Sequence, residues 1–98
     1  MRSLFPLTTL EVFLSETARR QVGELPLDFQ VRIKERLRKL SNDPYRSEPG
    51  TDIKKLRGPK RNYYRLRIGN YRAIYVIDGN RVLVAKVLPR SRAYEWIE

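Results

Sequence analysis

The sequence predicts an α+β fold in which two N-terminal helices pack on a mainly antiparallel, twisted sheet. A chain of 98 residues has room for one hydrophobic core, so we expect a single domain over residues 1–98. Apolar residues recur at helical spacing between residues 15 and 40, whereas strand-like alternation dominates from residue 63 onward. The expected order of elements is β-α-α-β-β-β, followed by a short C-terminal tail or helix.

The N-terminal half has signals for one strand and two helices. Aliphatic side chains occupy every second position of residues 10–14, which suits a strand of about five residues. Ser15 then gives a start signal, and the apolar spacing after it predicts a helix to about Leu25. Pro26 stands at a favoured first-turn position, and the apolar stripe behind it predicts a second helix that ends near Leu40.

The rest of the chain reads as a loop followed by three strands. Residues 41–52 are rich in Pro, Gly, Ser and Asp, which indicates a loop. Residues 63–77 alternate in polarity or are rich in aromatic and β-branched residues, and Gly69-Asn70 can turn the chain between them. A β-hairpin is therefore expected. Residues 78–80 supply a second turn signal before a third strand at residues 81–88.

The positive charge of the chain is confined to its second half. The formal net charge is +10. The segment from Lys54 to Tyr94 carries twelve Lys or Arg residues and one acid, Asp78, whereas residues 1–53 carry nine basic and eight acidic residues. The second half is therefore expected to hold a polyanion, on a scaffold that the first half provides.

Composition excludes several kinds of chemistry. The chain has neither Cys nor His, so disulfides, thiol nucleophiles and the commonest metal ligand are absent. The longest apolar runs are far too short to cross a bilayer, and the first ten residues lack the apolar core of a signal peptide. We therefore expect a cytoplasmic protein without cofactor, metal site or membrane contact.

The expected hairpin register gathers arginines on one face. If Gly69-Asn70 is a two-residue loop, Arg67 lies directly opposite Arg72, and Arg65 shares their face because side chains alternate along a strand. Like charges opposite one another destabilise a sheet pair by roughly 0.2–1 kcal/mol, and no local acid is expected to neutralise them. The arrangement favours a bound anion. The alternative is a solvated sheet face, where Lys and Arg only discourage edge aggregation.

A fourth cation depends on the next turn. If Asp78–Asn80 is a three-residue loop that pairs Ile77 with Arg81, then Arg72 also faces Lys86. Five further basic residues precede the hairpin. They suit a solvated loop or a nonspecific phosphate contact, and we expect them to contribute affinity: Lys54, Lys55, Arg57, Lys60 and Arg61.

The C-terminal segment adds two guanidinium groups and a phenol, from Arg90, Arg92 and Tyr94. Neighbouring cations favour the ionised form of a phenol, so Tyr94 is the best candidate for a base at neutral pH among these residues. The alternative role of a lone tyrosine is packing or stacking.

Three segments carry a resemblance to a known family. Leu56-Arg57-Gly58, the run YRLRIGNYRAIY at residues 64–75, and RSRAY at residues 90–94 resemble the RelE family of toxins from bacterial and archaeal toxin–antitoxin pairs. The expected order of elements is also that of the family, so the resemblance covers nearly the whole chain. The related ParE branch shares these features, but its members inhibit DNA gyrase.

The resemblance implies an activity and partners. Members of the RelE branch cleave mRNA in the ribosomal A site by attack of a 2′-hydroxyl on the adjacent phosphate, without metal, and a small antitoxin neutralises them. This chain would then be a metal-independent endoribonuclease that inhibits translation. Its partners would be the ribosome, mRNA and a cognate antitoxin, with which it would form a hetero-oligomer. A ParE-like gyrase inhibitor and a non-catalytic RNA-binding module remain as alternatives.

The resemblance also implies catalytic roles for six residues: Arg65, Arg67, Arg72, Arg90, Arg92 and Tyr94. Tyr94 would help to take the 2′-hydroxyl proton, and Arg65 and Arg72 would hold the scissile phosphate. Arg67, with Arg90 or Arg92, would stabilise the leaving 5′-oxygen.

This chain departs from the family pattern at two places. Both basic positions of the second strand are Arg, where well-studied members have Lys, and Arg cannot lose a proton to act as a base. The C-terminal motif is also tighter than the common Arg-x-x-Tyr ending, which leaves open whether Arg90 or Arg92 is the equivalent arginine.

Overall fold

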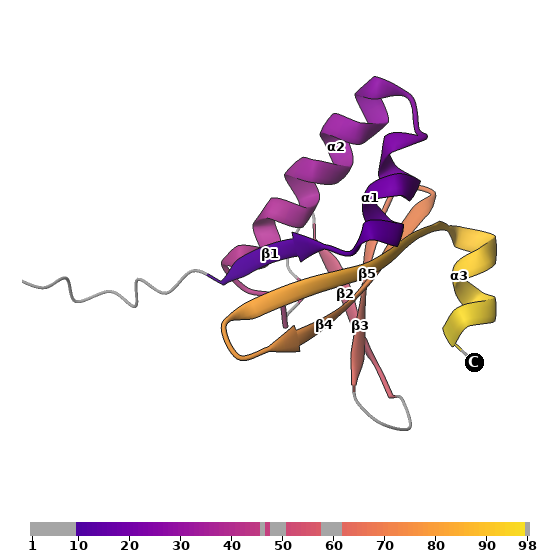
Figure 1. Ribbon diagram of the computed structural model, residues 1–98. Coiled ribbons are helices and arrows are strands. Elements are labelled where there is room, and N and C mark those ends of the chain that lie inside the picture. The colour runs from indigo at the N-terminus through magenta and orange to yellow at the C-terminus, as the bar shows by residue number, and fades with distance from the viewer. Residues whose placement is uncertain (1–9, 46, 48–50, 58–61, 98) are drawn as a thin grey trace, which may run out of the picture.

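The computed structural model describes residues 10–45, 47, 51–57 and 62–97, with side chains up to Ala93. Nine elements follow one another in these residues: β1 (Glu11–Leu14), α1 (Glu16–Gly23), α2 (Leu27–Arg38), a 3-10 turn η1 (Lys39–Ser41), β2 (Asp52–Leu56), β3 (Tyr63–Ile68), β4 (Tyr71–Asp78), β5 (Arg81–Pro89) and α3 (Arg90–Ile97). The five strands form one sheet in the order β1-β5-β4-β3-β2. β1 runs parallel to β5, and every other pair is antiparallel. The predicted α+β class, with two N-terminal helices on a mainly antiparallel sheet, is confirmed (Figure 1).

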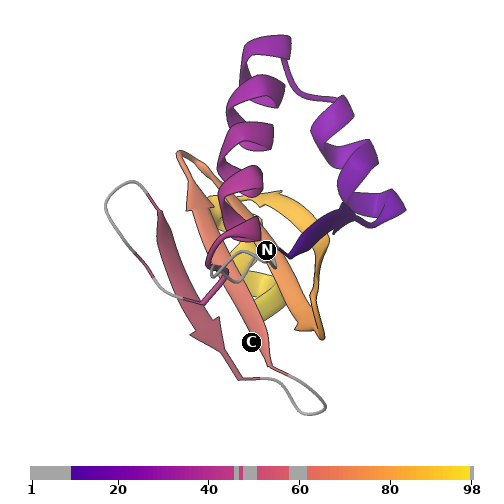
Figure 2. The same ribbon diagram turned by 90° about the vertical axis from the view of Figure 1, so that its left-hand side faces the viewer.

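The sheet has one strand more than the sequence predicted. β2 occupies residues that were expected to belong to loops, and it forms one edge of the sheet (Figure 2). Its pattern is weak because Ile53 and Leu56 are its only apolar residues. The hydroxyl of Ser47 accepts a hydrogen bond from the Ile53 N–H (2.7 Å) and donates one to the Ile53 carbonyl (2.8 Å). These bonds occupy backbone groups on the free edge of the strand.

Hydrogen bonds of the N-cap residue of α1 and of one side chain of the helix hold α1 against β5. The Ser15 hydroxyl accepts a hydrogen bond from the Ala18 N–H (3.0 Å), as an N-cap does, and donates one to the Ala85 carbonyl (2.7 Å). The Gln21 side-chain carbonyl accepts a bond from the Val87 N–H (2.7 Å). Ala85 is skipped where the β4–β5 ladder shifts register, and both Ala85 and Val87 lie beyond the last β1–β5 pair, so α1 satisfies backbone groups that β1 does not reach.

The predicted register of the first hairpin is confirmed. Ile68 pairs with Tyr71, and Arg67 with Arg72, across the two-residue turn at Gly69-Asn70. Gly69 has a φ of 59°, which a glycine adopts without steric cost.

The predicted register of the second hairpin is wrong. Asp78 pairs with Arg81 across a two-residue turn, and a bulge between Ile74 and Tyr75 shifts the ladder once more. Arg72 consequently lies opposite Leu88 instead of Lys86, which pairs with Ile74. Gly79, whose φ is 61°, makes the tight turn, while nothing in the alternation of side chains announces the bulge.

The two sheet faces have different environments. Leu66, Ile68 and Tyr75 lie in the hydrophobic core with Ile33 and Leu37 of α2, as the sequence predicted. The arginines of β3 and β4 project from the other face. The phenol of Tyr75 donates a hydrogen bond to the Pro44 carbonyl (2.7 Å), which ties the segment after η1 to the core. Burial raises the pKa of this phenol well above its ordinary value.

Replacing Tyr75 with Phe should lower the free energy of unfolding at pH 7 by about 1–3 kcal/mol, because the buried Pro44 carbonyl loses its donor. A tyrosine whose pKa is raised by folding holds its proton more tightly in the folded protein. Its stabilisation is therefore complete below the ordinary pKa, near 10, and declines as the pH rises above that value. Urea unfolding should show a smaller difference in free energy of unfolding between the unmodified protein and Tyr75→Phe above pH 10 than at pH 7. A gap that widens with pH would contradict this assignment.

Candidate anion-binding site on the open sheet face

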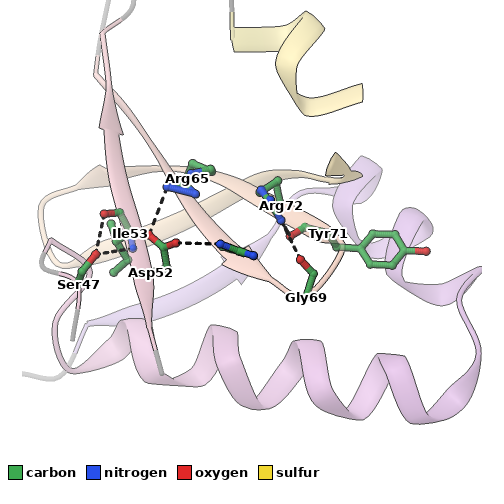
Figure 3. A network of polar contacts seen from close by, with 8 residues as sticks. Ser47, Asp52, Ile53, Arg65, Gly69, Tyr71 and Arg72 are labelled. Carbon is green, nitrogen blue, oxygen red and sulfur yellow. Dashed lines mark hydrogen bonds and ion pairs between the residues drawn. The ribbon is translucent and has the colours of Figure 1, made fainter. Parts of the chain in front are cut away.

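A pocket of about 370 Å³ lies on the sheet face opposite α2. Seven residues from β2, β3, β4 and α3 line it: Lys54, Leu56, Arg65, Arg67, Arg72, Arg90 and Ala93. Figure 3 shows α2 on one side of the strands and α3 on the other, with Arg65 and Arg72 on the side of α3. Five of the seven lining residues are cations, so the pocket is suited to an anion.

The strand register places the cations of β2, β3 and β4 next to one another. Lys54 pairs with Arg65, and Arg67 pairs with Arg72, so these four side chains share one face. Ala93, which is buried, brings α3 close to the strands. The pocket is therefore a direct consequence of sheet pairing, closed at one end by the first turn of α3.

Arg72 is buried, with 6% of its surface exposed, where the sequence predicted an open face. One terminal nitrogen of its guanidinium donates hydrogen bonds to the carbonyls of Gly69 and Tyr71, both at 2.9 Å. The Asn70 carbonyl of the same turn accepts a hydrogen bond from the Arg90 N–H (2.8 Å) at the start of α3. One hairpin turn thus positions two arginines of the pocket.

Asp52 contradicts the expectation that no acid lies near the arginines. One of its carboxylate oxygens lies 3.3 Å from a terminal nitrogen of Arg65 (Figure 3). The other lies 3.8 Å from a terminal nitrogen of Arg67. Half-exposed ion pairs of this kind contribute about 0–1 kcal/mol. The sequence missed Asp52 because it was assigned to a loop; once β2 is recognised, its pairing with Arg67 follows from the register.

Arg65 retains an unused donor. Its side chain is 15% exposed, and its Nε is buried without a hydrogen-bond partner. A buried donor without a partner costs about 1–3 kcal/mol. Because this nitrogen is closed off from solvent, the Arg65 side chain would have to turn before an anion could accept its hydrogen.

Of the predicted catalytic residues whose side chains the structure describes, all but one line the pocket. Four predicted catalytic arginines line the pocket: Arg65, Arg67, Arg72 and Arg90. Arg92 is exposed and does not line it, so Arg90 is the arginine that the start of α3 brings to the site. Tyr94 lies on α3, but its side chain is outside the described residues.

Of the predicted RNA- or ribosome-binding residues that the structure describes, one lines the pocket. Lys54 lines the pocket, although it lies on a strand and not in the expected loop. Three others do not line it: Lys55, Arg57 and Lys86. Lys55 follows Lys54 on β2, so its side chain lies on the other face of the sheet. Lys60 and Arg61 lie outside the described residues.

Among the described residues, no helix is long and apolar enough to cross a membrane. No group of three His, Cys, Asp or Glu side chains among them is arranged to hold a metal ion.

The fold and the pocket define a small α+β protein with a cationic site on the open face of its sheet. Residues 12–94 match the family model of the ParE toxin of type II toxin–antitoxin system, parDE. Toxin RelE3 of Methanocaldococcus jannaschii is 30% identical over 87 residues, which cover 89% of this chain and 98% of that protein. The chain therefore belongs to the RelE/ParE superfamily of toxins from toxin–antitoxin systems, and it is a toxin of RelE type.

Solved structures agree with this membership. The archaeal RelE–RelB complex from Pyrococcus horikoshii contains a chain with a TM-score of 0.74 and 29% identity, and the match covers 86% of this chain and 98% of that one. The toxin–antitoxin complex RelBE2 from Mycobacterium tuberculosis gives a TM-score of 0.72 and 28% identity over 87% of this chain and 95% of that one.

Replacing Gly69 with Ala should destabilise the protein by about 1–2 kcal/mol, because the side chain strains a backbone with a φ of 59° although no atom lies within 4 Å of the new Cβ. Gly23→Ala is the matched control, since this position of α1 is equally open and has no positive φ. It should be stabilising by about 0.5–1 kcal/mol. Urea unfolding of both variants checks the pair, and equal effects would show that the turn does not constrain the hairpin.

Proposed function

We propose that this toxin is a ribosome-dependent mRNA endoribonuclease. The observation that carries the proposal is the gathering of four arginines and one lysine around a single pocket of about 370 Å³. The similarity to RelE toxins supports the choice of substrate, because the resemblance implies mRNA in the ribosomal A site. Cleavage of mRNA on the ribosome inhibits translation, and this action takes place in the cytoplasm.

The reaction is a transesterification followed by release of the downstream RNA. The 2′-oxygen forms a bond to the adjacent phosphorus while the bond from phosphorus to the 5′-oxygen breaks. The products are a 2′,3′-cyclic phosphate and a 5′-hydroxyl. No metal takes part in the proposed reaction, so protein side chains stabilise the additional negative charge of the pentacoordinate phosphorus.

Arg65 and Arg72 hold the scissile phosphate. The guanidinium of Arg72 is fixed by two backbone carbonyls before the substrate binds, so it needs little reorganisation during the reaction. Donors that are oriented in advance toward developing charge are often the largest single contribution to catalysis. The guanidinium of Arg65, which lines the same pocket, supplies further hydrogen bonds to a phosphate oxygen through its terminal nitrogens.

Tyr94 is the proposed base, and Arg67 and Arg90 act on the leaving group. Tyr94 takes the 2′-hydroxyl proton in its ionised form, the phenolate, which neighbouring cations favour; an arginine cannot lose a proton at neutral pH. Arg67 and Arg90 stabilise the 5′-oxygen as it leaves. A guanidinium is a poor general acid, so a water molecule delivers the proton to that oxygen.

A cognate antitoxin is the protein partner in this proposal. Two of the similar structures are complexes of RelE-type toxins with their antitoxins. The net charge of +10 favours an antitoxin with an acidic or amphipathic segment, and the resulting complex is a hetero-oligomer.

Gyrase inhibition is the second candidate function, since the matching family model is that of a ParE toxin. A toxin that only binds gyrase has no need of a convergent arginine pocket, which is why the nuclease is preferred. A non-catalytic RNA-binding module would use the same cations without cleaving RNA or being toxic.

Replacing Arg72 with Ala should slow mRNA cleavage on programmed ribosomes about 100–1000-fold, because a donor to the transferring phosphate is lost. Arg81→Ala is the matched control: this exposed arginine lies at the opposite end of β5 from Arg90 and stacks on Phe13. Thermal unfolding confirms that both variants are folded. If Arg72→Ala cleaves at the unmodified rate, Arg72 is not a catalytic residue. If the unmodified protein leaves mRNA intact while it blocks gyrase supercoiling, the ParE-like function replaces the nuclease.

Replacing Tyr94 with Phe should reduce cleavage far more than ribosome binding, because the ring remains while the ionisable oxygen is removed. Single-turnover cleavage measures the first quantity and co-sedimentation with ribosomes the second. Parallel losses in both measurements would assign Tyr94 to binding and leave the reaction without its base.

A further inference from the structure

Asp52 is a carboxylate that contacts two arginines of the pocket proposed to bind an anion, Arg65 and Arg67, and its role as inferred here rests on that proposed function. It lies on β2 directly opposite Arg67, and its neighbour Ile53 is held by both hydrogen bonds of Ser47. The position of Asp52 is therefore set by strand pairing and by the hydrogen bonds between the Ser47 hydroxyl and the Ile53 backbone, which Figure 3 shows.

The carboxylate is divided between two guanidinium groups. One oxygen contacts Arg65 at 3.3 Å and the other contacts Arg67 at 3.8 Å, so neither arginine receives the paired contact that its planar fork is able to make. On Arg65, the contacted terminal nitrogen and the partnerless Nε belong to the same guanidinium. A phosphate offers several oxygens on one tetrahedral centre, so it is able to make paired contacts with the terminal nitrogens of a guanidinium, which Asp52 does not make.

We propose that Asp52 is a built-in competitor for the phosphodiester of single-stranded RNA at Arg65 and Arg67. In the free protein its carboxylate occupies donors that phosphate oxygens take in the complex. Asp52 is 51% exposed, so its carboxylate is able to turn into water when displaced. The long contact to Arg67, whose side chain is 56% exposed, is exchanged first.

This competition has a functional consequence. A phosphate that reaches the pocket without other contacts must displace Asp52 by itself, whereas an RNA held at additional sites does so with the help of those contacts. Asp52 thereby weakens binding to loose polyanions, to which a strongly basic protein otherwise binds nonspecifically. It also stabilises the cross-strand arginines while the pocket is empty.

Replacing Asp52 with Asn tests the competition, with Asp78→Asn as the matched control. Each change removes one negative charge, but Asp78 is the last residue of β4, at the end of the strand far from Arg72. The probe is a short single-stranded RNA with 2′-O-methyl groups, which binds without being cleaved. We expect Asp52→Asn to bind it about three- to tenfold more tightly than the unmodified protein, and Asp78→Asn less than about twofold.

The outcomes separate this inference from the proposed function. If the unmodified protein binds the RNA and Asp52→Asn binds it no more tightly than Asp78→Asn, Asp52 does not compete with the RNA, whereas the proposed anion-binding pocket is retained. If no version of the protein binds the RNA or inorganic phosphate, both are wrong. Inorganic phosphate as a separate probe distinguishes recognition of phosphate alone from recognition of RNA.

A measurement on the unmodified protein covers the case in which Asp52→Asn does not fold. During titration with inorganic phosphate, the NMR signal of the Asp52 carboxylate carbon should move together with the guanidinium signals of Arg65 and Arg67. Movement of the arginine signals with an unchanged Asp52 signal would overturn the proposal.

Discussion

The two-residue turn between β3 and β4 is the constraint on which the site depends. Its glycine, Gly69, has a φ of 59°, and the turn sets the register that places Arg67 opposite Arg72. The carbonyls of Gly69 and Tyr71 hold the Arg72 guanidinium, and that of Asn70 accepts the first N–H of α3. A slip of one residue would move every side chain of a strand to the other face and remove the pocket.

The cationic pocket opposes the stability of the sheet that carries it. Like charges on paired residues cost roughly 0.2–1 kcal/mol. The protein offsets this cost locally: Asp52 on the edge strand contacts Arg65 and Arg67, and backbone carbonyls accept hydrogen bonds from Arg72. Such compensation is partial, as the unused Nε of Arg65 shows. Sites that bind ligands commonly retain strain or charge imbalance of this kind.

The sequence predicts the features of this protein that local rules determine. The pairing of Arg67 with Arg72 follows from turn chemistry and side-chain alternation, and the structure confirms it. β2 was missed because an edge strand with two apolar residues carries little pattern, and with it the sequence missed Asp52. The bulge beside Ile74 and the burial of Arg72 arise from tertiary packing, which no local period encodes.

The most direct test of the account is to analyse the ends of mRNA after incubation of the unmodified toxin with programmed ribosomes. The account predicts breaks within the ribosomal A site, with 2′,3′-cyclic phosphate on one side and 5′-hydroxyl on the other, and no such breaks in free mRNA. Intact mRNA, together with loss of gyrase supercoiling in a parallel reaction, would contradict it.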